Sequence, residues 1–222
     1  MTSPKFQILA ITGSGSGFGA AIAREGSRQG YQILSLGRSH SPTADVRLDV
    51  DLSSKQAVIR VAEKLKNYNI STLILNAFKF GNVARAEQIG IEEIGETLQI
   101  NLLAQKLLVD AVLQTGTLTE VIAISSGAAS RGYAGWLHYC IGKAALDSML
   151  RVYSEEKKGI KFWSASPGVL SGSLNKHLLA VAGNYEWKDK LSSSASSPEA
   201  KARKIITLLG DDVVSSGDWV KL

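Results

Sequence analysis

The sequence predicts an α/β fold with one doubly wound parallel sheet and helices on both of its faces. Short apolar runs alternate along the chain with longer segments of helical periodicity. A glycine-rich turn separates the first apolar run from the first helical segment, and polar residues directly follow several other runs. Alternating strands and helices build βαβ units with right-handed crossovers, which cover both faces of a parallel sheet. Such a sheet binds ligands outside the carboxyl ends of its strands.

Each predicted strand is a short apolar run, rich in Ile, Leu and Val and bounded by turn-forming residues. The predicted strands span residues 6–12, 31–36, 46–50, 72–75, 119–125 and 160–165, with a short final strand around Trp219. Predicted helices span residues 19–29, 53–68, 91–114 (with a possible earlier start at Arg85), 136–156 and 198–209. Gly30 ends the first helix, and Ser53 or Ser54 caps the second. The segment 169–197 is less regular and ends in a serine-rich run, so we expect it to form a substrate lid.

Composition and charge fit one globular domain over residues 1–222. The chain is 45% hydrophobic, enough to bury one sizeable core, and 20% charged. The formal charge is +5, but the basic residues are dispersed among acids, so we expect no nucleic acid partner. The longest uncharged run, residues 8–23, is too rich in Gly and Ser to span a membrane. A single cysteine, Cys140, and the absence of a secretory signal suit the cytoplasm and leave no metal-type cysteine pair.

The glycine-rich turn, from Thr12 to Gly19, has the composition of a phosphate-binding loop. It reads Thr-Gly-Ser-Gly-Ser-Gly-Phe-Gly between a predicted strand and a predicted helix. Glycine lets the backbone approach a pyrophosphate closely, and the helix N-terminus supplies unpaired N–H donors. A flexible Gly/Ser turn is the alternative, but the position after a strand and before a helix favours nucleotide binding.

Tyr139 and Lys143 are four residues apart in a predicted helix, which places them on one face a turn apart. A free phenol has a pKa of about 10 and transfers protons poorly near neutral pH. We expect the Lys143 cation to lower the pKa of Tyr139 toward the working range.

Together these motifs resemble the short-chain dehydrogenase/reductase family. The resemblance rests on the loop pattern T-G-x-x-x-G-x-G, on Asn76-Ala77, on Tyr139-x-x-x-Lys143 and on Pro167-Gly168, all in the family's order. It implies a single Rossmann-type sheet of about seven strands in the order 3-2-1-4-5-6-7. It also implies a nicotinamide cofactor, and a homodimer or homotetramer.

The resemblance implies a role for each matching residue. The expected catalytic residues are Asn101, Ser126, Tyr139 and Lys143. Neighbouring strand residues point to opposite faces, so only one of Ser125 and Ser126 should face the site. The spacing of thirteen residues before Tyr139 favours Ser126. The expected cofactor-binding residues are Gly13, Ser14, Ser16, Gly17, Phe18, Gly19, Arg38, Ser39, Asp51, Leu52, Asn76, Ala77, Phe78, Tyr139, Lys143, Pro167, Gly168 and Val169. Asp49 is an alternative to Asp51, and Phe78 stands where the family has glycine.

The end of the second strand favours NADP(H) over NAD(H). An acid there would bind the ribose hydroxyls and repel a 2′-phosphate, but Gly37 occupies that position and Arg38 follows it. Arg38 can pair with a phosphate through charge-assisted hydrogen bonds, although a surface arginine without this role is the alternative. A family threonine five positions after Pro167 is replaced by Gly172, and either Ser171 or Ser173 could take its role.

The sequence therefore predicts an oxidoreductase that moves a hydride between NADP(H) and a small carbonyl or alcohol substrate. One alternative is a sensor or scaffold that binds NADP(H) without turnover. Reduction of an imine or a pteridine-like ring is another, in which the serine is dispensable. No metal is expected, because the three histidines are scattered.

Overall fold

Seven parallel strands form one sheet in the order β3-β2-β1-β4-β5-β6-β7, as the sequence predicts. The computed structural model describes residues 7–222, so Phe6, the first residue of the first predicted strand, lies outside the described residues. The strands are β1 (Ile8–Thr12), β2 (Gln32–Gly37), β3 (Val46–Asp49), β4 (Ile70–Leu75), β5 (Glu120–Ile124), β6 (Lys161–Ser166) and β7 (Trp219–Lys221). The order reverses beside β1, where a doubly wound sheet opens its ligand crevice.

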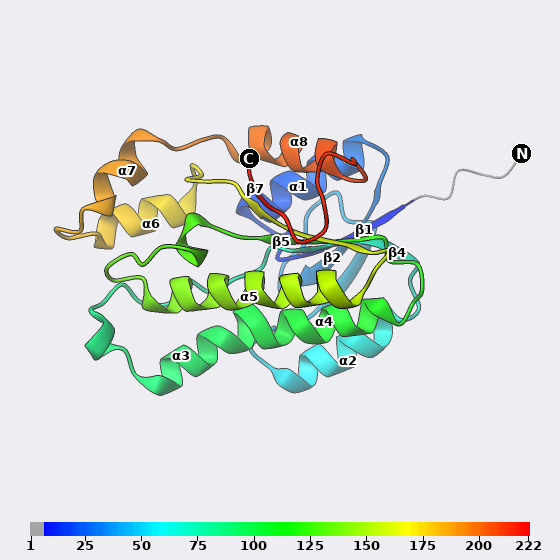
Figure 1. Cartoon of the computed structure of the whole chain (residues 1–222), viewed down its shortest axis with the longest axis horizontal. Coiled ribbons are helices and arrows are strands. Elements are labelled where there is room, and N and C mark those ends of the chain that lie inside the picture. The colour runs from blue at the N-terminus through cyan, green and yellow to red at the C-terminus, as the bar shows by residue number, and fades with distance from the viewer. Residues whose placement is uncertain (1–6) are drawn as a thin grey trace, which may run out of the picture.

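Helices cover both faces of the sheet. The long helices are α1 (Gly17–Arg28), α2 (Lys55–Leu65), α3 (Ile91–Leu98), α4 (Ala104–Leu113), α5 (Leu137–Glu156) and α8 (Pro198–Leu208). Figure 1 shows α1 and α8 on one side of the sheet and α2, α4 and α5 on the other. Two short 3-10 turns, Ala86–Gln88 and Gly127–Ala129, precede α3 and α5.

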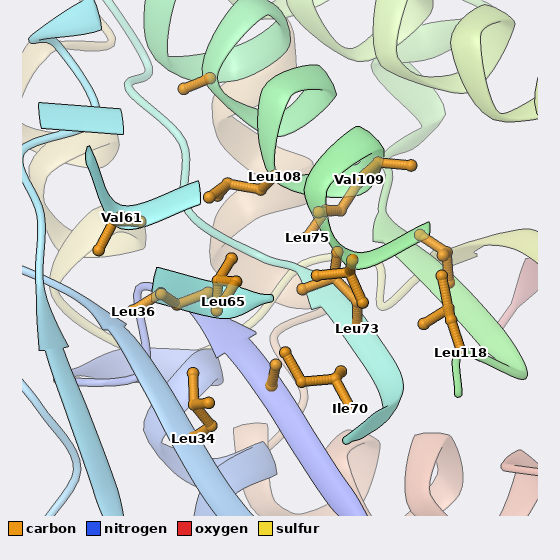
Figure 2. Close-up of a cluster of buried hydrophobic side chains, with 14 of the residues drawn as sticks. Leu34, Leu36, Val61, Leu65, Ile70, Leu73, Leu75, Leu108, Val109 and Leu118 are labelled. Carbon is orange, nitrogen blue, oxygen red and sulfur yellow. The ribbon is translucent and has the colours of Figure 1, made fainter. Parts of the chain in front are cut away.

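The alternation of side chains along the strands divides the core into two layers. Leu73 and Leu75 of β4 pack toward α2 and α4, whereas Ile74 packs toward α1 and α8. Figure 2 shows the first layer, in which Val61 and Leu65 of α2 and Leu108 and Val109 of α4 meet the leucines of β2 and β4. β1 and β5 are buried along their whole length, as expected for central strands covered on both faces.

The predicted helix over residues 91–114 is interrupted. Residues Gln99–Leu103 form a π-helical turn between α3 and α4. Because the turn keeps the helical direction, the hydrophobic periodicity of the sequence does not reveal it. π-Turns commonly lie at functional sites, and this one contains Asn101.

The sequence pattern indicated no helix in the less regular segment 169–197, but this segment forms α6 (Ser173–Val181) and α7 (Trp187–Ser193). Leu178 of α6 and Trp187 and Leu191 of α7 are buried against Trp136. This tertiary packing stabilises two helices that are too short and too rich in serine to show a clear periodic pattern. Figure 1 shows both helices beyond the sheet, at the end of the molecule where α5 begins.

Among residues 7–222, no helix combines the length and the apolar character needed to cross a membrane.

Candidate functional site

A cleft of about 1500 Å³ lies along the carboxyl ends of the strands. Segments that follow six strands, β1 to β6, contribute to its walls, together with α5, α6 and α7. Of the residues predicted from the sequence, the cleft is lined by Gly13, Ser16, Gly17, Phe18, Gly19, Arg38, Ser39, Asp51, Leu52, Asn76, Ala77, Phe78, Ser126, Tyr139, Lys143, Pro167, Gly168 and Val169.

Two predicted site residues do not line the cleft. Ser14 is completely buried, and its hydroxyl lies 2.5 Å from the hydroxyl of Ser35 in β2. Asn101 is buried behind the wall of the cleft, where its side chain accepts a hydrogen bond from the backbone N–H of Lys79 (2.7 Å) and donates one to the Lys79 carbonyl (2.8 Å). Both side chains therefore contact segments that border the cleft, Ser14 through Ser35 of β2 and Asn101 through the backbone of Lys79.

The glycine loop packs closely against the segment that follows β2. A Cβ atom on Gly15 would lie 2.6 Å from backbone atoms of Ser39, so no larger residue fits there. Gly13 has a φ of +68° and donates its N–H to the Leu36 carbonyl (2.7 Å). Asn76 fastens the loop by donating to the carbonyls of Thr12 (3.0 Å) and Gly13 (3.1 Å).

Thr12 is a further anchor that the sequence analysis did not assign. Its hydroxyl oxygen accepts hydrogen bonds from the backbone N–H groups of Asn76 and Ala77, both at 3.0 Å. The ends of β1 and β4 are thus joined directly beneath the loop. The sequence shows a threonine at the start of the glycine pattern, but its hydrogen-bond partners can be identified only from the structure.

The N-terminus of α1 suits an anionic group. Ser16 is the extended residue before the helix, its side chain makes no capping hydrogen bond, and the first turn contains no acid. Gly17 and Phe18 of that turn line the cleft. The first N–H groups of α1 and the positive end of its dipole are therefore directed at the cleft.

The end of the cleft near β2 and β3 combines Arg38 with Asp51. Arg38 is exposed on the cleft wall. Hydrogen bonds from Ser53 lower the pKa of Asp51, and the nearby charge of Arg38 lowers it further. Asp51 accepts from the backbone N–H of Ser53 at 3.0 Å, so it also organises the turn before α2. Asp49 instead contacts the His40 ring (2.9 Å) and does not line the cleft, which favours Asp51 over Asp49 as the predicted contact.

Ser126, Tyr139 and Lys143 meet at the centre of the cleft. Ser126 follows β5, and its hydroxyl accepts the N–H of Ala128 (3.2 Å) at the start of the 3-10 turn. Tyr139 and Lys143 lie one turn apart near the start of α5. The neighbouring Ser125 also borders the cleft, but it is almost fully buried and its hydroxyl donates to Asp147 of α5 at 2.6 Å.

The electrostatics of this centre differ from the prediction. Burial raises the pKa of Tyr139 to about 12, and the Ser126 hydroxyl beside it lowers the pKa only in part. Burial also lowers the pKa of Lys143 to about 8. The expectation that the pKa of Tyr139 is lowered toward the working range is not met in the protein alone, because burial of the phenol is the largest influence and raises its pKa. The Lys143 ammonium instead donates to the Ile124 carbonyl.

Phe78 packs beside both of these groups. The Lys143 Nζ lies 4.9 Å from the centroid of the Phe78 ring, and the Tyr139 ring lies 5.6 Å from it. A cation over an aromatic face is stabilised by the ring quadrupole. Phe78 is also partly exposed in the cleft, so the ring replaces the family's glycine with an apolar surface.

A buried carboxylate, Asp147, lies one further turn along α5 and was missed by the sequence analysis. It accepts hydrogen bonds from Ser125 (2.6 Å) and Ser164 (2.8 Å), and Trp219 of β7 donates to Ser125 (3.1 Å). The Asp147 charge raises the pKa of Lys143 and so opposes the effect of burial. In the sequence, Asp147 stands four residues after Lys143, a spacing that places both side chains on the same face of a helix.

After Pro167-Gly168 the chain pairs with Ser196, beyond the two helices α6 and α7. Ser171 donates its N–H to the Ser196 carbonyl, and Ser196 donates its N–H to the Val169 carbonyl, both at 2.9 Å. Ser171 and Ser173 both line the cleft, so either can take the role of the missing threonine. The segment that carries α6 and α7 is thus fastened at both of its ends beside the cleft.

Comparison with known proteins agrees with this geometry. The family model described as short chain dehydrogenase matches residues 7–181. Benzil reductase ((S)-benzoin forming) of Bacillus subtilis is 29% identical over 231 residues, covering 91% of this chain and 93% of the relative. Sepiapterin reductase of Xenopus laevis is 26% identical over 247 residues, covering 96% of this chain and 94% of the relative.

A solved structure shows the shared fold over nearly the whole chain. It is a protein of Beutenbergia cavernae described as a candidate NAD(P)-dependent gluconate 5-dehydrogenase, with NADP bound at low occupancy. The two structures match with a TM-score of 0.85 at 21% identity, covering 99% of this chain and 96% of the other. With the family match over residues 7–181 and the observed strand order, the chain belongs to the short-chain dehydrogenase/reductase family of oxidoreductases.

Proposed function

We propose that this chain reduces a carbonyl compound to an alcohol, or carries out the reverse reaction, with NADP(H) as cofactor and Tyr139 as the general acid or base. The observation that carries the proposal is the meeting of Ser126, Tyr139 and Lys143 in the cleft that the glycine loop also lines. The two reductases among the relatives support a carbonyl substrate.

The residues of the cleft fit a dinucleotide. The glycine loop offers a wall without side chains, and Gly17, with a φ of +53°, has open space around its Cβ position. A pyrophosphate would bind at the first turn of α1, and Arg38 would pair with a 2′-phosphate. When bound, the cofactor supplies or accepts the hydride.

Tyr139 and Lys143 have the protonation states that reduction requires. A pKa of about 12 keeps the Tyr139 phenol protonated near neutral pH, so it can donate its proton to the carbonyl oxygen as the carbon gains hydride. The products are the alcohol and a phenolate, which then takes a proton from solvent. Lys143, with a pKa of about 8, remains mostly cationic near neutral pH and stabilises that phenolate. Ser126 would hold the carbonyl oxygen beside the phenol.

The absence of an acid at Gly37 supports NADP(H) over NAD(H). Gly37 ends β2, and among the described residues the carboxylates that line the cleft are Asp51 and Glu96, neither of which follows β2. Arg38 is the charged residue at that position, and the bound NADP in the matching structure is consistent with this preference.

The test is NADPH oxidation with a panel of ketones and aldehydes, comparing the wild-type protein with Tyr139→Phe. We expect Tyr139→Phe to lower kcat by about 10²- to 10⁴-fold, because it removes the proton donor and keeps the ring. Tyr185→Phe is the matched control, since Tyr185 belongs to the neighbouring aromatic cluster but does not line the cleft, and this variant should keep full activity. NADPH binding, followed by fluorescence, should be unchanged in both variants.

Two outcomes would count against the proposal. A fully active Tyr139→Phe variant excludes the phenol as proton donor. A wild-type protein that binds NADPH tightly but oxidises none of it with any carbonyl compound favours the sensor or scaffold alternative.

A further inference from the structure

A continuous set of aromatic rings extends from Tyr139 toward α7. The Tyr139 ring stacks on Phe80 with centroids 4.7 Å apart and stands edge-on to Trp136 at 5.8 Å. Trp136 in turn contacts Tyr133 at 5.0 Å and Trp187 at 4.9 Å. These rings come from four separate segments: the loop after β4, the loop before α5, α5 itself and α7. The fold therefore gathers them at one place beside the proposed proton donor.

These rings form a wall of the cleft as well as a packing cluster. The cleft-lining rings are Phe78, Phe80, Tyr133, Trp136, Tyr139 and Trp187. Tyr185 belongs to the same cluster and stacks on Trp187 at 5.5 Å, but it does not line the cleft. A carbonyl oxygen held at Tyr139 and Ser126 thus has its substituents next to aromatic faces, which favour another aromatic ring in stacked or edge-on contact.

The charges at this end of the cleft are positive. Arg131, two residues before Tyr133, and Lys190, on the same helix as Trp187, both line the cleft. Of the two carboxylates that line the described cleft, Asp51 follows β3 at the far edge of the sheet, and Glu96 is paired with Lys79 at 3.0 Å. Among the side chains that line the described cleft, a cationic substrate therefore finds no unpaired acid beside the rings, whereas an uncharged or anionic one meets no repulsion.

Trp136 contributes a hydrogen-bond donor in addition to its ring. Its buried indole Nε1 has no hydrogen-bond partner among the residues that the structure describes, whereas Trp187 donates to the Ala134 carbonyl at 2.8 Å. A buried donor without an acceptor is unfavourable, and a ligand with an oxygen or nitrogen beside its ring would satisfy it once a shift of the indole exposes Nε1 to the cleft.

We infer that this aromatic wall is a substrate subsite and that the substrate is an uncharged or anionic ketone with an aryl group on its carbonyl carbon. The inference rests on the proposed carbonyl reduction and adds the class of ketone. The aryl ring lies against Trp136 and Trp187 while the carbonyl oxygen faces Tyr139. Leu178 of α6 and Leu191 of α7 pack in the same apolar cluster as the wall, so an aryl ring bound there is removed from water.

The test compares benzil, a diaryl diketone, with its saturated analogue 1,2-dicyclohexylethanedione. The readout is the ratio of the two kcat/KM values in NADPH oxidation, measured for the wild-type protein and for variants. Because the intrinsic reactivity of each ketone is the same for every variant, a change in the ratio reports on the wall. A second readout is calorimetric binding of the two compounds to the Tyr139→Phe variant with NADP⁺, which requires no turnover.

We expect the wild-type protein to prefer benzil, and Trp136→Leu and Trp187→Leu each to reduce the preference about tenfold. Trp136→Phe keeps a ring and should retain most of the preference. Tyr185→Leu is the matched control, because it removes a ring of the same cluster that does not line the cleft. NADPH affinity and melting temperature, measured for each variant, show that the protein remains folded.

A ratio near one in the wild-type protein, or a ratio that neither tryptophan variant changes, would overturn the aryl subsite even if both ketones are reduced. That result would leave the proposed carbonyl reduction intact. If no ketone is reduced, the proposed function fails, but preferential binding of benzil to the Tyr139→Phe complex would still support the subsite. Equal or absent binding of both compounds there would overturn it.

Discussion

At the scale of single residues, the pKa values of Tyr139 and Lys143 are determined mainly by burial, which their spacing in the sequence does not reveal. The four-residue spacing shows that the two groups are neighbours, but the direction of a pKa shift depends on how completely each is removed from water. Lys143 is 4% exposed and has its pKa lowered to about 8. A buried lysine keeps its charge only if a carboxylate or a set of acceptors supports it, and Asp147 provides that charge.

The first prediction at this scale concerns Asp147→Asn. The substitution keeps the size of the side chain and one of the two oxygens that accept from Ser125 and Ser164, and it removes the negative charge, so the pKa of Lys143 should fall further below 8. Because the lysine loses its charge as pH rises through its pKa, the alkaline decline in reductase activity should move to lower pH, by about one unit. The measurement is kcat/KM between pH 6 and pH 10.

Ser164→Ala is the control for this experiment, since it removes one hydrogen bond to Asp147 and keeps the charge. Its alkaline decline should coincide with that of the wild-type protein. An Asp147→Asn profile that does not move would show that the carboxylate has no influence on Lys143.

At the scale of elements, the π-turn packs closely against α5 because Gly142 of α5 has no side chain. Asn101 of the π-turn lies against Gly142 of α5, where a Cβ atom would come within 2.9 Å of the Asn101 amide nitrogen. The Asn101 side chain in turn holds both backbone groups of Lys79, in the loop that carries Phe78 and Phe80. Gly142 therefore sets the position of a loop that it does not touch.

Substituting Gly142 with alanine should displace Asn101 and lower kcat/KM about tenfold. Alanine in a helix otherwise adds about 0.5–1 kcal/mol of stability over glycine. Gly95→Ala in α3 is the matched control, because the space around its Cβ position is open. That control should raise the free energy of unfolding in urea and leave activity unchanged. If Gly142→Ala behaves in the same way as Gly95→Ala, the contact with Asn101 has no functional role.

At the scale of the whole molecule, the parts of the site that the sequence could predict are those that directly follow a strand. Arg38, Asp51, Asn76, Ser126 and Pro167 all lie at carboxyl ends of strands, and parallel strands bring these ends to one edge. Their order along the chain was therefore enough to place them together.

The parts that could not be predicted depend on contacts between distant segments. Phe80 meets Tyr139 across 59 positions of sequence, and Trp187 meets Trp136 across 51. The helices α6 and α7 form because Leu178, Trp187 and Leu191 bury against Trp136, not because of their local sequence. Pattern reasoning could suggest that Trp136 and Tyr133 line a pocket, but it could not separate this from core packing.

Because the cleft is bordered by segments from both halves of the sheet, a bound cofactor should stabilise the molecule as a whole. A ligand that binds only the folded state adds RT ln(1 + [L]/Kd), which is about 2.7 kcal/mol at a concentration of 100 Kd. For a chain of this length we expect NADPH at that excess to raise the melting temperature by roughly 5–10 °C.

NADH at the same concentration should raise the melting temperature less, because it lacks the 2′-phosphate that Arg38 would bind. Arg38→Ala should remove most of the difference between the two cofactors, through loss of a charge-assisted hydrogen bond. Differential scanning fluorimetry of both proteins with both cofactors makes the comparison, and an equal shift by NADH and NADPH in the wild-type protein would refute the assignment of Arg38 to the phosphate.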